Sequence, residues 1–180
     1  MRRDQFEHAI RAAGAILGVN EVLVIGSQAI HATVGSVFPE AQRSIEVDIA
    51  SLDDEDGSKA DLIDGSIGEL SVFQETFGYY AQGVTPSTAI LPDGWRKRLI
   101  SFRTPATNGV TALCLESHDL WLSKAIAGRP KDIEFCAALI REEIVKPSVL
   151  RRRLSRISDL ESAIFERVGN MIDRLSGDSP

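Results

Sequence analysis

The chain has 180 residues, 43% hydrophobic and 26% charged, enough for one large domain or a smaller domain with a helical extension. Its formal net charge of -6 and its pI of about 5.1 argue against a broad nucleic-acid-binding surface, which needs excess lysine and arginine. The two cysteines lack the spacing of a zinc site, and no apolar run approaches the roughly 20 residues that span a bilayer. The N-terminus has no apolar signal core, so we expect a soluble, cytoplasmic protein without a membrane partner.

The first part of the chain mixes helix and strand patterns. Phe6, Ile10 and Leu17 lie on one helical stripe, and Asp4 with Glu7 fits a capping box at the start of that helix. The other elements expected here are strands over 21–25 and 43–50, a short helix over 27–34, a loop over 35–42, a helix over 59–70, and β segments over 77–84, 88–91, 99–103 and 110–115.

From Ser117 onward the pattern becomes helical. The sequence therefore predicts an α+β fold, in which residues 1–116 form a mixed sheet flanked by helices and residues 117–180 form a C-terminal helical region packed on that core. The boundary signals of the four expected helices are Ser117 as an N-cap, Gly128 as a stop, Pro130 and Pro147 as starts, and an apolar stripe over 159–175.

Two dense basic clusters interrupt the acidic composition. They are Arg96-Lys97-Arg98 and Arg151-Arg152-Arg153 with Arg156, and we interpret both as solvated surface. His118 and Asp119 stand at the predicted start of a helix, where an acidic side chain complements the helix dipole, so we assign both an ordinary helix-start role.

The turn at Gly26-Ser27 is the first candidate for chemistry. It joins the end of a strand to the start of a helix, where backbone N–H groups are available to bind phosphate. Glycine permits close approach of the backbone, and the serine hydroxyl can add a donor. An ordinary turn with an N-cap has the same sequence.

Glu46 and Asp48 are the second candidate. On a strand, residues two apart point to the same face, roughly 7 Å apart at Cα. Two carboxylates placed in this way can share Mg²⁺, which retains waters and takes up phosphate oxygens of a substrate. The alternative is that the pair forms only the solvent face of an amphipathic edge strand.

Three further stretches accompany these motifs. They are Leu91-Pro-Asp-Gly-Trp95-Arg-Lys-Arg98-Leu, Cys114-Leu-Glu-Ser-His118-Asp119-Leu and Ser123-Lys124-Ala-Ile-Ala-Gly128-Arg129-Pro-Lys131-Asp132-Ile-Glu-Phe. With the Gly-Ser turn and the alternating carboxylates, they resemble the nucleotidyltransferase superfamily. The chain specifically resembles small bacterial nucleotidyltransferase-like proteins related to the AbiEii-type toxins of type IV toxin–antitoxin systems, over roughly residues 5 to 145.

The resemblance implies a nucleotidyltransferase-like fold and Mg²⁺-dependent transfer of a nucleoside monophosphate from NTP to an acceptor hydroxyl. The third stretch looks like the family's K-x-x-A-G-R-x-K-D element, whose basic side chains would neutralise phosphate charge. The implied site residues are Glu46, Asp48, Lys124 and Asp132 as catalytic groups, Glu46 and Asp48 as metal ligands, and Gly26, Ser27, Lys124, Arg129 and Lys131 as nucleotide-binding groups.

Two of these residues also have simpler interpretations. Lys124 can be a surface lysine that follows an apolar helix face. Asp132 lies in the first turn of a helix, where it can complement the helix dipole, hold Lys124 or Arg129, or act as a base toward the acceptor.

The chain departs from the family pattern in two ways. Glu46 stands where the family usually has aspartate, and residues 77–84 contain no third carboxylate. A second hypothesis is therefore a catalytically degenerate module of the same fold that binds nucleotide or protein. A third is a toxin held by a cognate antitoxin, and the acceptor could be RNA such as tRNA, a protein or a small molecule.

Overall fold

The structure, a computed structural model, describes residues 1–35 and 38–177 and divides into two compact units. Unit 1 comprises Met1–Thr88 and Leu99–Leu115. Unit 2 comprises residues 89–98 together with the chain from Glu116 onward.

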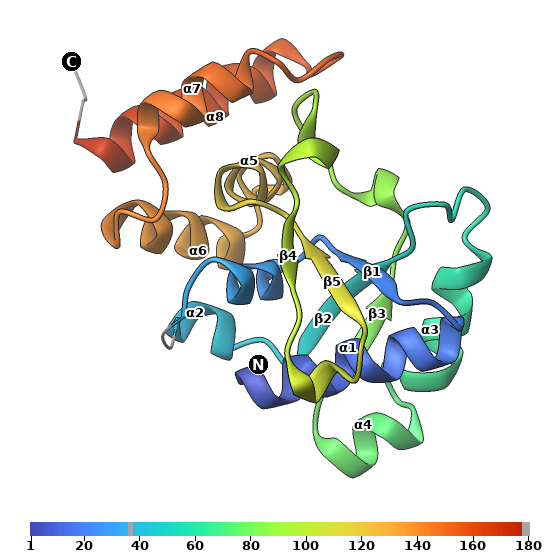
Figure 1. Ribbon diagram of the computed structural model, residues 1–180. Coiled ribbons are helices and arrows are strands. Elements are labelled where there is room, and N and C mark those ends of the chain that lie inside the picture. The colour runs from blue at the N-terminus through green and yellow to red at the C-terminus, as the bar shows by residue number, and fades with distance from the viewer. Residues whose placement is uncertain (36–37, 178–180) are drawn as a thin grey trace. The chain divides into compact units, whose positions relative to one another are not determined.

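Unit 1 contains a five-stranded sheet in the order β3-β2-β1-β5-β4 (Figure 1). β1 pairs in parallel with β5, and β2 pairs in parallel with β3, whereas the β1–β2 and β4–β5 pairs are antiparallel. The predicted α+β fold with a mixed sheet and C-terminal helices is thus confirmed. The strands are β1 (Glu21–Val24), β2 (Glu46–Ala50), β3 (Tyr80–Gly83), β4 (Ile100–Phe102) and β5 (Thr111–Cys114).

Two helices, α1 (Arg3–Leu17) and α3 (Ser58–Ile67), cover the first face of this sheet. The ring of Phe6 in α1 lies 5.2 Å from that of Phe102 in β4. α3 packs so tightly on β3 that a Cβ at Gly83 would lie 2.0 Å from the carbonyl oxygen of Ala60, so only glycine fits there. The fully buried strand residues of this face are Val22, Val24, Val47, Ile49, Ala81, Ala112 and Cys114.

The second face of the sheet carries the candidate carboxylates. Leu23 pairs with Ala50, and Ile25 donates its backbone N–H to the carbonyl oxygen of Asp48 at 3.3 Å. Because side chains alternate along a strand, Asp48 and Glu46 share this face with Leu23 and Ala50. The exposure of the β2 residues agrees with this alternation, since Glu46 and Asp48 are half-buried and the residues between and after them are buried.

Several elements of unit 1 differ from the prediction. Residues 27–34 form the shorter 3₁₀ helix η1 (Ser27–Ala32), and the expected loop over 35–42 contains α2 (Pro39–Gln42), with Ser36 and Val37 outside the described residues. The helix predicted to reach Leu70 ends at Ile67, because Gly68 packs against the Asp64 backbone where a Cβ would clash.

Three further predictions of secondary structure need correction. After Gly68 the chain starts a separate helix, α4 (Val72–Phe77), so the predicted β segment over 77–84 begins only at Tyr80. The β segment predicted over 88–91 is wrong, because the 3₁₀ turn Pro86–Thr88 leads the chain out of the sheet. α1 is capped by Arg2, whose N–H donates to Gln5 Oε1, rather than by an Asp4 capping box.

Unit 2 is helical. Trp121 is fully buried and donates its Nε1–H to the carbonyl oxygen of Cys136 at 3.0 Å, which joins two neighbouring helices. Glu116, not Ser117, is the first N-cap, because its carboxylate accepts a hydrogen bond from the His118 backbone. The helices are α5 (Ser117–Ala127), α6 (Pro130–Arg141), α7 (Pro147–Leu154) and α8 (Ser162–Ser176).

Within the part of the chain that the structure describes, no helix has the length and apolar character that crossing a membrane requires.

Candidate functional site

Gly26 and Asp48 meet at the centre of the candidate site. A Cβ at Gly26 would lie 1.5 Å from Asp48 Oδ2 and 2.6 Å from its Cγ, so the carboxylate occupies the space that any other side chain would fill. Gly26 is the N-cap of η1 and directly follows β1 and Ile25, whereas Asp48 lies in the adjacent strand β2. Gly26 and Asp48, which belong to separate sequence motifs, are therefore in direct contact.

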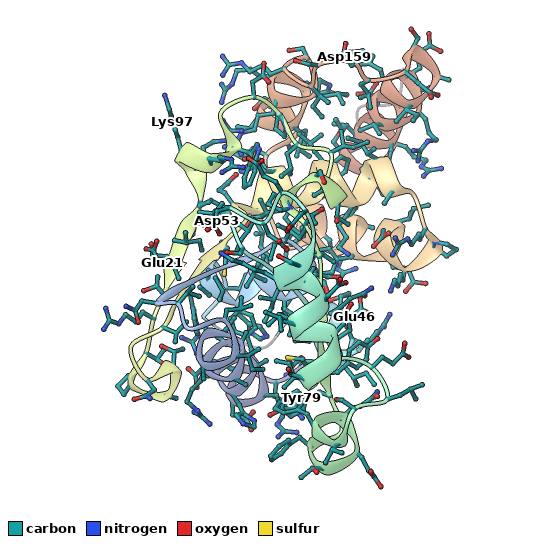
Figure 2. The ribbon with its side chains drawn as sticks, turned by 90° about the vertical axis from the view of Figure 1, so that its right-hand side faces the viewer. Glu21, Glu46, Asp53, Tyr79, Lys97 and Asp159 are labelled. Atoms are coloured by element: carbon teal, nitrogen blue, oxygen red, sulfur yellow. The ribbon has the colours of Figure 1, made fainter. Side chains whose placement is uncertain are left out.

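Glu46 lies on the same face of β2 and binds a tyrosine. The Tyr80 hydroxyl donates to Glu46 Oε2 at 3.0 Å, and the two residues are register partners in the parallel β2–β3 pair. The next partner pair is Asp48 with Gln82, which is exposed. β3 thus presents a hydroxyl and an amide, not a carboxylate, beside the acidic pair. Glu46 is the first residue of β2 and Tyr79 immediately precedes β3, and both residues are labelled in Figure 2.

The surroundings of this pair are acidic. Burial of the phenol raises the pKa of Tyr80 to about 12, assisted by its hydrogen bond to Glu46 and by nearby negative charges. Those charges belong to Glu46, Glu69 and Asp48. Unit 1 as a whole contains six lysine and arginine residues against fourteen aspartate and glutamate residues. An excess of negative charge of this size attracts cations and repels a bare triphosphate.

Ser27 begins η1 and is half-buried. Its hydroxyl forms no hydrogen bond with residues 1–35 or 38–177 and can therefore donate to a ligand. Because η1 is a six-residue 3₁₀ helix, its dipole is small and adds little to anion binding at this turn.

The acidic pair fits one Mg²⁺ ion that also binds substrate phosphate. Mg²⁺ is commonly held by one or two carboxylates, with water and phosphate oxygens completing six ligands. Glu46 and Asp48 provide two carboxylates on one face, and the missing Cβ of Gly26 makes room for the Asp48 carboxylate itself. No group of three or more His, Cys, Asp or Glu side chains is placed to hold a metal within the described ranges. The described residues alone therefore do not provide a complete set of metal ligands.

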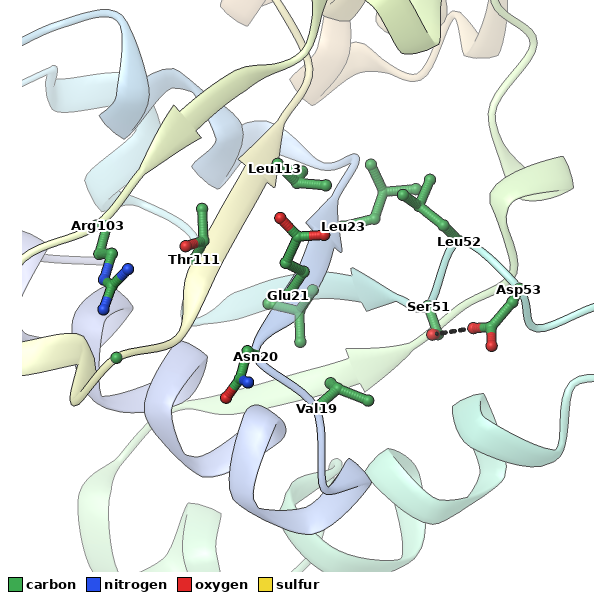
Figure 3. A pocket seen from close by; sticks show the side chains of 12 residues that line it. Val19, Asn20, Glu21, Leu23, Ser51, Leu52, Asp53, Arg103, Thr111 and Leu113 are labelled. Atoms are coloured by element: carbon green, nitrogen blue, oxygen red, sulfur yellow. Dashed lines mark hydrogen bonds between the residues drawn. The ribbon is translucent and has the colours of Figure 1, made fainter.

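A pocket of about 570 Å³ opens on unit 1 near the start of β1 (Figure 3). Glu21, Thr111 and Arg103 form a row across it, since Glu21 pairs with Thr111 and Arg103 directly follows β4 on the other side of β5. Leu23 and Leu113, another register pair, form its apolar part. None of the site residues predicted from sequence lines this pocket.

The pocket and the acidic pair share one face of the sheet. Leu23 lines the pocket and is the partner of Ala50, two residues beyond Asp48 on β2. Two residues along a strand correspond to roughly 7 Å. The Leu23 edge of the pocket is therefore its nearest part to Asp48, and the pocket extends from there away from the carboxylates, toward Glu21 and Ser51.

The remaining predicted residues belong to unit 2. Lys124 Nζ lies 3.0 Å from Asp132 Oδ1, and only 3% of the Asp132 side chain is exposed. Arg129 Nε lies 3.9 Å from Asp132 Oδ2, although the arginine is mostly exposed. Lys131 is exposed. The structure therefore brings Lys124, Arg129 and Asp132 together, with the aspartate buried and paired to the lysine.

Unit 2 also contains an ion-pair network that the sequence interpretation missed. Asp119, which is 1% exposed, binds Arg98 Nε at 2.7 Å and Arg153 Nη1 at 2.9 Å. The assignment of Arg98 and Arg153 to solvated surface is therefore wrong, as is a mere helix-start role for Asp119. The two arginines are 55 residues apart in sequence, and no local pattern indicates that they meet.

Glu116 and His118 extend this network. Burial alone would raise the pKa of Glu116, but hydrogen bonds from His118 and Arg153 outweigh it and lower the pKa to about 2. His118 Nε2 accepts the Lys146 backbone N–H at 2.9 Å. Both ring nitrogens of His118 therefore form hydrogen bonds, Nδ1 with Glu116 and Nε2 with the Lys146 backbone.

Comparison with known proteins gives one match. Residues 5–167 match a protein family described as nucleotidyltransferase of unknown function (DUF6036). No curated protein and no solved structure matches the chain significantly.

Proposed function

The chain belongs to this family of nucleotidyltransferases of unknown function, and on that premise we propose that it transfers a nucleoside monophosphate from an NTP to an acceptor hydroxyl with Mg²⁺. Glu46 and Asp48 would hold the metal ion, and Gly26 and Ser27 would hold the phosphates. The observation that carries the proposal is the contact between Asp48 and Gly26.

That contact supports nucleotidyl transfer because it joins two requirements of the reaction. Metal-dependent transfer needs a carboxylate beside the phosphate-binding turn, which the missing Cβ of Gly26 permits, and it needs the negative charge of the triphosphate neutralised. When bound, Mg²⁺ supplies that neutralisation and polarises the phosphate oxygens. The acid-rich unit 1 repels NTP alone but attracts the cation, so metal and nucleotide would bind together.

The transfer is an in-line displacement. The acceptor oxygen forms a bond to the α-phosphorus while the bridge to the β-phosphate breaks, pyrophosphate leaves, and the hydroxyl proton passes to a carboxylate or to water. The pocket beside Leu23 and Leu113 offers space for the acceptor on the same sheet face as Asp48. Lys124, Arg129 and Lys131, which the resemblance predicts to neutralise phosphate charge, belong to unit 2, where Lys124 pairs with Asp132.

The test uses purified protein, Mg²⁺ and each of the four NTPs labelled at the α-phosphate. We expect pyrophosphate release that falls roughly a thousandfold in Asp48→Asn. Glu75→Gln, which removes an exposed carboxylate of α4, serves as the matched control and keeps wild-type activity. The proposal would be overturned if the wild type bound no Mg²⁺–NTP and Asp48→Asn changed nothing in the assay.

The same assay identifies the acceptor. Label that appears on tRNA, on protein or on a small molecule assigns the acceptor class directly. A cognate antitoxin, which the resemblance to toxin–antitoxin proteins predicts, is tested by whether the candidate antitoxin suppresses this labelling.

The register of β3 against β2 favours a second candidate function, nucleotide binding without catalysis. Tyr80 and Gln82 stand beside Glu46 and Asp48, so β3 contributes no third carboxylate. A degenerate module of the same fold would bind Mg²⁺–NTP through Asp48 but release no pyrophosphate. Nucleotide binding without turnover for any NTP and acceptor would establish this alternative.

A further inference from the structure

Tyr80 contacts the one residue at which the acidic pair departs from its family pattern. Its hydroxyl donates to Glu46 Oε2 at 3.0 Å, across the register pair that joins β2 and β3. The sequence gives no sign of this contact, because the two residues are 34 positions apart. Only the parallel pairing of the strands places them side by side.

Glu46 needs such a partner for a geometric reason. A glutamate side chain is longer than aspartate by one methylene, about 1.5 Å, and has one more rotatable bond. An unrestrained carboxylate of this length can occupy several rotamers, and metal-dependent transfer depends on precise placement of the ligands. The Tyr80 hydroxyl fixes Oε2, which leaves Oε1 to bind a ligand.

Tyr80 is itself well fixed. Its side chain is 8% exposed, and its backbone N–H donates to the Ile45 carbonyl oxygen at 3.0 Å. We infer that Tyr80 is a positioning residue of the nucleotidyltransferase site, which orients Glu46 for Mg²⁺–nucleotide binding and thereby compensates for the longer acidic side chain. This inference rests on the proposed function. Hydrogen-bonded partners behind a ligand typically change metal affinity or activity by 10–100-fold when they are removed.

A double-mutant cycle on the full-length protein tests the inference, with affinity for Mn²⁺–ATP as the readout. Tyr80→Phe should lower the affinity about tenfold in the wild-type background. In the Glu46→Asp background it should change the affinity less than twofold, since the shorter carboxylate no longer reaches the hydroxyl. A merely structural role of Tyr80 would produce the same loss in both backgrounds.

Tyr79→Phe is the matched control. Tyr79 is also buried, and its hydroxyl also forms a hydrogen bond, but to His8 of α1 on the other face of the sheet. This variant should keep the Mn²⁺–ATP affinity within twofold. Equal affinity of the wild type and Tyr80→Phe overturns the inference and leaves the proposed function intact. If the wild type binds no Mn²⁺–ATP, the proposed function fails and the inference fails with it.

A second substitution keeps the inference testable if Tyr80→Phe does not fold. Tyr80→Met replaces the phenol with a flexible apolar side chain, and the same double-mutant cycle with Glu46→Asp is then run on it. An equal loss of Mn²⁺–ATP affinity in the wild-type and Glu46→Asp backgrounds would overturn the inference.

Discussion

The carboxylates of unit 1 and unit 2 have the same chemistry but different neighbours. In unit 2, Asp119 binds two arginines and Asp132 binds Lys124, and both are almost fully buried. In unit 1, Glu46 is half-buried and accepts a hydrogen bond from an uncharged tyrosine. Buried carboxylates paired to arginine or lysine stabilise a fold only as complete pairs. Half-buried carboxylates in an acid-rich unit favour an external cation instead, which is why we assign the site to Glu46 and Asp48.

Isosteric substitutions in the two units separate these roles most strongly. Asp119→Asn should destabilise the protein by about 3 kcal/mol, because it leaves Arg98 and Arg153 without their buried counter-charge. Asp48→Asn should instead abolish Mg²⁺–NTP turnover, because it removes a carboxylate assigned to the metal ion. Urea unfolding and pyrophosphate release measure the two effects. The comparison would fail if Asp119→Asn lost turnover without losing stability and Asp48→Asn lost stability without losing turnover.

Gly26→Ala tests the contact that defines the unit 1 site. The new Cβ would lie 1.5 Å from Asp48 Oδ2, so the carboxylate must move. We expect Mg²⁺–NTP turnover to fall roughly a hundredfold, since misplacement by about 1 Å has effects of this size. Gly35→Ala is the control, because a Cβ there meets nothing within 4 Å. Equal activity of both variants would contradict the assigned site.

Acid titration sharpens the description of unit 2. The folded-state pKa of Glu116 is depressed from 4.5 to about 2, so its contribution to stability is present above pH 4.5 and is lost as pH falls toward 2. Glu116→Gln should therefore be roughly 1–2 kcal/mol less stable than wild type near pH 6. The difference should vanish near pH 2. Unfolding curves at several pH values measure it, and a difference independent of pH would contradict the ion-pair account.

The smallest expected effect concerns the pocket of unit 1. Leu113→Trp adds volume at a half-buried position of its apolar part. It should raise the KM for the acceptor about threefold to tenfold and leave Mn²⁺–ATP affinity unchanged. Steady-state kinetics with the identified acceptor measure the change. Loss of nucleotide affinity instead would place the nucleotide, not the acceptor, in this pocket.

The sequence predicted the parts of the fold that depend on local patterns. Apolar runs located all five strands to within a few residues, and Gly128 and Pro130 correctly separated α5 from α6. The segment 88–91 was assigned wrongly because its apolar residues have no partner strand, which a local pattern cannot reveal. The β segment over 77–84 was shortened by α4, whose capping serine Ser71 was not recognised.

The candidate site was predictable only in part, for the same reason. Gly26, Glu46 and Asp48 could be selected because glycine turns and alternating carboxylates are visible in a short window. The contact of Asp48 with Gly26 depends on the antiparallel β1–β2 pair, and that of Tyr80 with Glu46 on the parallel β2–β3 pair. Such pairings are set by tertiary packing, so sequence spacing does not indicate them.

The central claim, that the acidic pair of unit 1 is the cation site, is tested most directly by Mn²⁺ binding. Electron paramagnetic resonance of free Mn²⁺ measures the bound fraction in the presence of a non-hydrolysable ATP analogue. We predict that wild type and Glu75→Gln bind Mn²⁺ with similar affinity, whereas Asp48→Asn loses at least about a hundredfold. Equal binding by wild type and Asp48→Asn, or no binding by the wild type, would contradict the account.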